Sequence, residues 1–111
     1  MSGRVGRIGD RRTFRELAES GHRVRVGPVT VVYLHRQTGP RVAYAVGRRV
    51  GSAVVRNKVR RRLREIVRRD ADLLESGAYL VVAHPRAAEA SFEELSSSLR
   101  RALRLVRKEV V

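Results

Sequence analysis

One segment of the chain concentrates side chains that suit phosphate binding. Residues 48–69 contain ten of the 25 Lys and Arg residues and a single acid, Glu65. Guanidinium groups offer planar, forked donors to phosphate oxygens, and an Asn can donate to or accept from an RNA hydroxyl or base edge. The candidate RNA contacts are Arg48, Arg49, Arg56, Asn57, Lys58, Arg60, Arg61, Arg64 and Arg68.

The apolar residues of the same segment predict a helix that opens at Gly51-Ser52. They occur at Val55, Val59, Leu63, Ile66 and Val67, the spacing that lines one face of an α-helix and leaves the cations on the other. Like charges so close together repel one another, which a bound polyanion would relieve. Nucleic acid is the favoured partner, while a solvated face, a membrane-surface helix and a capping role for Asn57 stay open as alternatives. The membrane alternative is weak because no Trp or Phe lies on the apolar face.

Composition supports a polyanionic partner. The chain has 111 residues with 42% hydrophobic content, enough for one domain over residues 1–111 with a modest core. A net charge of +14 favours nucleic acid, and the lack of cysteine fits a reducing compartment. No signal-like or membrane-spanning apolar run is present, so we expect a soluble, cytoplasmic protein.

The remaining pattern predicts a single α+β domain with the order α-β-β-β-α-β-α. Residues 1–12 are expected to be a flexible basic extension, and Thr13 with Glu16 has the pattern of a capping box that starts a helix ending at Gly21. A second capping box at Ser91 and Glu94 starts the last helix. Four strands of one sheet are predicted at residues 24–26, 29–35, 41–46 and 78–83. Most β-α-β units in one sheet are right-handed, and this rule favours a right-handed crossover between the last two strands.

These residues carry a resemblance to a known family. Residues 53–64, AVVRNKVRRRLR, resemble the Arg-Asn signature of the bacterial ribonuclease P protein component at every position. Further matches lie along nearly the whole chain: Arg7-Ile8, Phe14, Tyr33, residues 47–51, residues 79–83 and residues 92–95.

The resemblance implies an accessory subunit. In that family a catalytic RNA performs Mg²⁺-dependent removal of the 5′ leader of precursor tRNA, and the protein binds both RNAs. The implied fold is a sandwich with a left-handed β-α-β crossover, like the second domain of ribosomal protein S5, which we prefer here to the general rule. The Arg-Asn helix would face the catalytic RNA, and Phe14 and Tyr33 match aromatic positions of a cleft for the leader. Core packing is the alternative for both, and Ala18 stands where the family often has a second aromatic residue.

Catalysis by the protein itself finds no support in the sequence. The three histidines, His22, His35 and His84, are scattered without metal-ligand spacing, and no Gly-rich phosphate loop follows a strand. We therefore predict no catalytic residue and no protein-bound metal, with Mg²⁺ acting through the RNA subunit. The predicted partners are the catalytic RNA and precursor tRNA, with no membrane contact and no protein partner that the sequence identifies. A structural RNA-binding protein, such as a small ribosomal protein, is the main rival, and a DNA-binding helix is a third possibility.

Overall fold

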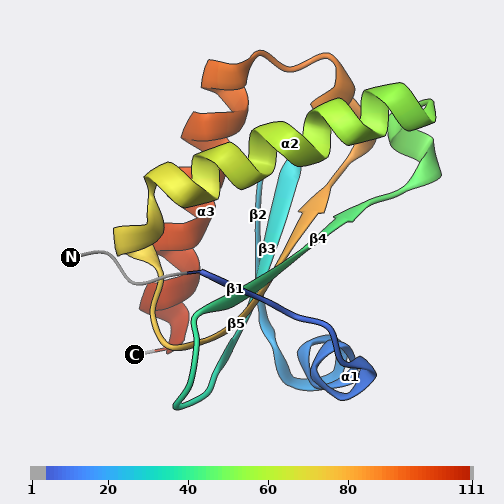
Figure 1. Ribbon diagram of the computed structural model, residues 1–111. Coiled ribbons are helices and arrows are strands. Elements are labelled where there is room, and N and C mark those ends of the chain that lie inside the picture. The colour runs from blue at the N-terminus through green and yellow to red at the C-terminus, as the bar shows by residue number, and fades with distance from the viewer. Residues whose placement is uncertain (1–4, 111) are drawn as a thin grey trace.

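The computed structural model describes residues 5–110 (Figure 1). Its helices are α1 (Arg11–Ser20), α2 (Ala53–Arg69) and α3 (Phe92–Val110), with short 3₁₀ turns at Arg48–Val50, Ala71–Leu73 and Pro85–Ala88. Its strands are β1 (Gly6–Arg7), β2 (His22–Val26), β3 (Val29–His35), β4 (Arg41–Val46) and β5 (Gly77–Ala83). None of the helices among these residues is long and apolar enough to cross a membrane.

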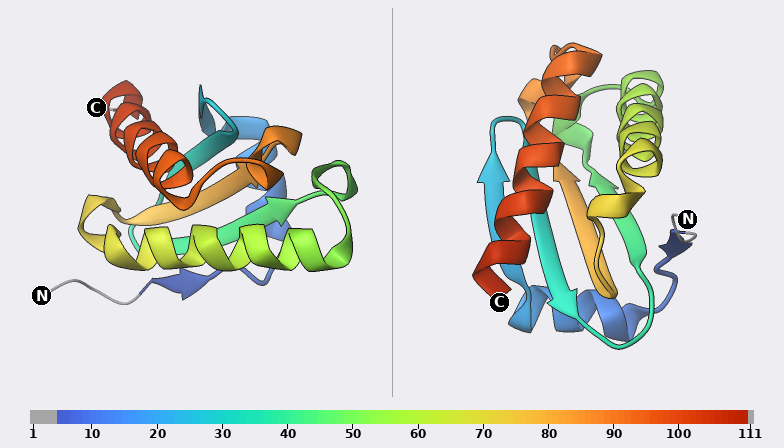
Figure 2. Two further views of the ribbon diagram at one scale, coloured as in Figure 1. Left: turned by 90° about the horizontal axis from the view of Figure 1, so that it is seen from above. Right: turned by 90° about the vertical axis from the view of Figure 1, so that its left-hand side faces the viewer.

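The strands form one mixed sheet in the order β1-β4-β5-β3-β2. β5 lies at the centre, parallel to β4 and antiparallel to β3. In the right-hand view of Figure 2, β4 rises, α2 descends in front of the sheet, and β5 rises on the left of β4, which is a left-handed crossover. The α+β class and this crossover are confirmed, and the sheet has five strands where four were predicted.

The extra strand lies in the segment that was predicted to be flexible. Gly6 and Arg7 pair in parallel with Arg41 and Val42, so β1 covers the outer edge of β4. Residues 5–12 thus contain a strand and the start of a helix, and residues 1–4 lie outside the described part of the chain. Two residues held only by their partner strand have no sequence pattern of their own, which is why the prediction missed them.

The first helix also begins one turn earlier than predicted. Asp10 is its N-cap, and the Asp10 carboxylate accepts from the Thr13 backbone N–H at 3.0 Å and from its hydroxyl at 2.6 Å. An aspartate is at least as good an N-cap as a threonine, so Thr13 lies inside the helix. These hydrogen bonds favour the ionised form and hold the pKa of Asp10 below its usual value.

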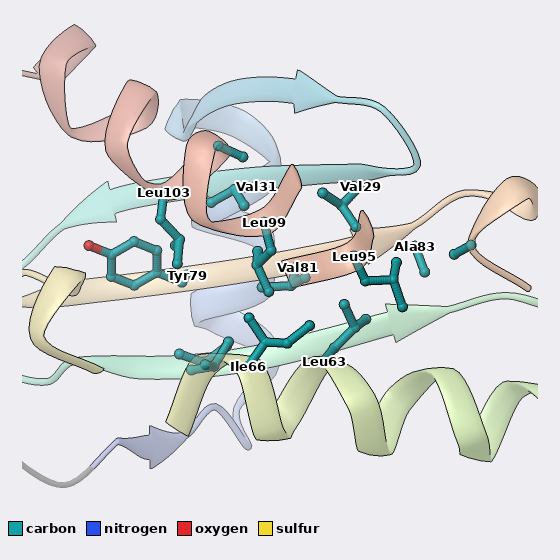
Figure 3. Packing of buried hydrophobic residues seen from close by; sticks show 14 of the residues in the cluster. Val29, Val31, Leu63, Ile66, Tyr79, Val81, Ala83, Leu95, Leu99 and Leu103 are labelled. Atoms are coloured by element: carbon teal, nitrogen blue, oxygen red, sulfur yellow. The ribbon is translucent and has the colours of Figure 1, made fainter. Parts of the chain in front are cut away.

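The helices cover both faces of the sheet. α2 and α3 pack on one face, where the main core forms (Figure 3), and α1 packs on the other over a smaller cluster that includes Leu17, Val32 and Leu34. The main core combines residues from three sources: Leu63 and Ile66 of α2, Leu95, Leu99 and Leu103 of α3, and Val29, Val31, Tyr79 and Val81 of the sheet. β3 is covered on both faces, so all its residues except His35 are buried.

Gly21 ends α1 as predicted, and the reason is space. A Cβ at this position would lie 2.5 Å from a methyl carbon of Val32 and 2.6 Å from the carbonyl oxygen of Leu17. Only glycine therefore lets the end of α1 approach the sheet this closely.

Candidate nucleic-acid interface

α2 presents the predicted basic face because its apolar face is anchored in the core. Ser52 caps the helix by accepting from the Val55 backbone N–H at 3.3 Å. The side chains of Val59, Leu63, Ile66 and Val67 are at most 2% exposed. The helical assignment and its buried face are confirmed, and the cations between these residues point outward.

Several side chains on this face are held in place by neighbours. Arg60 donates to the side-chain oxygen of Asn57 at 3.0 Å, and the guanidinium of Arg64 lies 5.8 Å from the ring centre of Tyr44. Burial raises the pKa of Tyr44 to about 12, so this phenol is neutral at physiological pH. The Asn57 oxygen accepts within its own helix, and among the described residues no loop donates to it.

The cations of α2 are not equally available. Glu65 accepts from Arg68 at 2.6 Å and from Arg69 at 2.9 Å, and these bonds hold the pKa of Glu65 below its usual value. The predicted contact Arg68 thus carries a charge that Glu65 partly neutralises. Arg62, which was not among the predicted contacts, donates to the carbonyl oxygen of Ala90 at 3.2 Å and serves the fold.

The N-terminal half of the basic face retains the most binding capacity. Arg48 and Arg49 are exposed in the turn before α2, and Lys58 and Arg61 are exposed on the helix. The Nε of Arg56 is buried and has no hydrogen-bond acceptor among the described residues. An incoming phosphate can reach the exposed cations Arg48, Arg49, Lys58 and Arg61, but not this buried nitrogen.

A groove of about 890 Å³ connects this face to α1 around the β1 edge of the sheet. Phe14 of α1, which is 40% exposed, lies on one side of the groove. On the other side are the guanidinium-bearing side chains Arg60, Arg64 and Arg68. Flat side chains for base stacking and cations for the backbone are the two components of a site for single-stranded nucleic acid.

Tyr33, the second predicted cleft residue, does not lie in this groove. Its side chain is 2% exposed and packs in the main core, with its ring centre 4.5 Å from that of Tyr79. The phenol donates to the carbonyl oxygen of Ser76 at 2.5 Å. Residues 29, 31 and 33 of β3 face α3, whereas the groove with Phe14 opens beside α1. Tyr33 therefore packs as the core alternative describes, and its contact with a leader strand stays a prediction.

The sequence-based prediction missed two contributors to the groove. They are β1, through Gly6 and Arg7, and β4, through the half-buried Tyr44. The alternation in residues 41–46 marked Tyr44 as lying on the same face as Val42 and Val46. The local sequence pattern does not indicate that β1 completes the groove.

The described residues contain no group of three or more His, Asp or Glu side chains that could hold a metal ion. Together, the sheet flanked by helices and the outward basic face of α2 define a small α+β protein with a surface suited to a polyanion.

Comparison with known proteins identifies the family. Residues 3–107 match the family model described as Ribonuclease P. A ribonuclease P protein component from Nocardioides sp. is 43% identical over 112 residues, covering 94% of this chain and 93% of the relative. One from Acidothermus cellulolyticus is 43% identical over 95 residues, covering 81% of this chain and 78% of the relative.

Solved structures agree with the fold. The RNase P protein from Staphylococcus aureus superimposes with a TM-score of 0.83 at 23% identity, covering 92% of this chain and 95% of that one. The RNase P protein from Thermotoga maritima gives a TM-score of 0.80 at 25% identity, covering 89% and 96%. The chain belongs to the ribonuclease P protein component family. It is a protein subunit of that endoribonuclease, which matures the 5′ end of tRNA, and the catalysis resides in the RNA subunit.

Proposed function

We propose that the basic face of α2 binds the catalytic RNA while the groove beside β1 takes the 5′ leader of precursor tRNA. The observation that supports this proposal is the groove itself, which is lined both by Phe14, 40% exposed, and by Arg60 and Arg64 of α2. A leader strand in the groove would stack on the ring and meet the edge of the basic face. One protein surface then contacts substrate and catalyst at the same time.

The partners in this proposal are the catalytic RNA and precursor tRNA, and the compartment is the cytoplasm. Mg²⁺ is held by the RNA subunit. The protein contributes by lowering the repulsion between two polyanions, since residues 48–69 bring ten cations and one acid to the place where they would meet. Less Mg²⁺ is then needed for substrate and catalyst to approach each other.

A Mg²⁺ titration of single-turnover cleavage tests the proposal. Precursor tRNA is incubated with the cognate RNA alone, with the protein alone, and with both. We expect cleavage at lower Mg²⁺ with both than with RNA alone, and none with protein alone. Identical Mg²⁺ curves with and without the protein would contradict the proposal and would favour a purely structural RNA-binding role.

A further inference from the structure

A second charged hollow, of about 1060 Å³, lies on the side of the main core that α3 covers. It is bounded by the C-terminal half of α3, the end of β3 and the loop before β5. Four cations line it, Arg101, Arg104, Arg107 and Lys108, together with a single carboxylate, Glu75. The proposed roles of α2 and the β1 groove do not use this surface.

The base of this hollow is fixed by hydrogen bonds. Tyr33 donates to the Ser76 carbonyl oxygen, and the Tyr79 hydroxyl accepts from the Glu75 backbone N–H at 2.8 Å. Arg107 donates to the Glu75 carboxylate at 2.9 Å, which joins the loop to α3. These contacts tie the loop before β5 to three elements, so the hollow is preformed.

The cations at its rim are free for a ligand. Arg101, Arg104 and Lys108 are exposed and follow one another at helical i, i+3 and i+7 positions, which places them along one side of α3. Among the side chains that the structure describes, none of the three forms an ion pair with a carboxylate. Arg100 and Arg107 differ, because each is paired with an acid on the loop between α2 and β5.

We propose that this hollow is a second RNA-binding surface, which takes the sugar-phosphate backbone of a single strand. Seven helical residues separate Arg101 from Lys108, about 10 Å along the axis, which matches about three steps of a stacked strand. An acidic protein fits less well, because a protein interface needs a buried apolar anchor at its centre, and the apolar lining here, Tyr33 and Leu105, is already buried or partly buried in the fold.

The position of this surface gives it a separate role. In the right-hand view of Figure 2, the C-terminal end of α3 and the N-terminal end of α2 lie at opposite corners of the helical layer. RNA held by the first turns of α2 would therefore leave the α3 surface open for another strand. The inference rests on the proposed function in taking RNA as the partner, but it does not depend on which residues of α2 bind.

Charge removal at the two surfaces tests the inference with the full-length chain. The variants are R101Q/R104Q for the α3 surface, R60Q/R64Q for α2, and R23Q/R25Q as a control that removes two exposed charges from the edge strand β2. The probe is a fluorescent oligouridine of about 12 nucleotides, within the site sizes of single-strand binders. Affinity is measured between about 50 and about 200 mM salt.

We expect R101Q/R104Q to reduce the slope of log affinity against log salt by about 1.4, because each lost contact to a single strand removes about 0.7. R23Q/R25Q should leave the slope unchanged. An unchanged slope for R101Q/R104Q, or an equal reduction in the control, would overturn the second surface. If R60Q/R64Q alone reduced the slope, the α3 surface would be refuted and the proposed function would stand.

A crosslinking experiment covers the case in which R101Q/R104Q does not fold. The chain has no cysteine, so S97C places a unique thiol on α3, one turn before Arg101 on the same exposed side. With a photoreactive group on this thiol, the oligouridine should crosslink. S20C, at the exposed end of α1, is the control. Equal or absent crosslinking at position 97 would refute the α3 surface.

Discussion

The basic face of α2 yields the sharpest prediction. Replacing its four central arginines with glutamine should leave the fold intact and weaken binding to the catalytic RNA in a salt-dependent way. Glutamine has nearly the helix propensity of arginine, and fewer like charges on α2 lower its internal repulsion. The main loss to stability is the contact between Arg64 and Tyr44, worth about 0.5–1 kcal/mol. The replaced residues are Arg56, Arg60, Arg61 and Arg64.

The magnitude follows from counterion release. Each phosphate contact contributes about 0.7–0.9 to the slope of log affinity against log salt, so four contacts contribute about 2.8–3.6. Between about 50 and about 200 mM salt, the wild-type affinity should therefore fall about 50- to 150-fold more than the affinity of the variant. Arg68 is kept, because Glu65 already neutralises part of its charge.

Filter binding across this salt range measures the slopes, and circular dichroism checks the fold. The matched control also loses four exposed arginines, none of which lines the groove: Arg12, Arg23, Arg25 and Arg36. For this control, the slope of log affinity against log salt should change by well under half as much as for the α2 variant. If both quadruple variants lost the same slope, general charge rather than the α2 surface would account for binding, and the reasoning would be refuted.

Four further predictions concern single side chains. Phe14→Ala should reduce the preference for precursor over mature tRNA about five-fold or more, since stacking contributes about 1–3 kcal/mol per base. Ala18→Phe, which adds an exposed ring one turn later, should raise that preference; unchanged preferences in competition cleavage would exclude stacking on α1. Tyr33→Phe removes the hydrogen bond to Ser76 and should lower the free energy of unfolding by about 0.5–1.5 kcal/mol in urea, leaving substrate preference intact. Burial lowers the pKa of His84 below its usual 6.5, so the folded state takes up this proton at lower pH than the unfolded state. Stability should therefore rise with pH through the interval just below 6.5 and fall on acidification, and His84→Gln should flatten this dependence in urea midpoints.

The sequence predicted the helices and strands whose apolar residues recur with a clear helical or strand periodicity. α2 combines a cap at Ser52 with an apolar stripe and a basic remainder, so its start, its buried face and its exposed face followed from local pattern. The left-handed crossover came from the family resemblance. Nothing in the pattern of residues 41–83 indicates its hand, and the general rule would have given the opposite answer.

The predictions differed from the structure at residues that have no distinctive hydrophobic pattern of their own. In β3, the run VTVVYLH is apolar at nearly every position because helices cover both faces of the strand, so no alternation shows which side Tyr33 faces. In β1, two residues gain their conformation only from pairing with β4. The position of the groove, which depends on both strands, could not be obtained without the tertiary structure.

β1 protects one edge of the sheet from pairing with another molecule while the protein is not bound to RNA. A sheet with an open edge offers unpaired amides and carbonyls to the edge of another molecule, which is a common route to aggregation. On one side of this sheet β1 occupies the edge of β4. On the other side the edge strand β2 carries the exposed charges of Arg23 and Arg25, which repel a second copy. Both features should keep protein that is not bound to RNA from aggregating through its sheet edges. A chain that began after Arg7 would lose this protection on the β4 side.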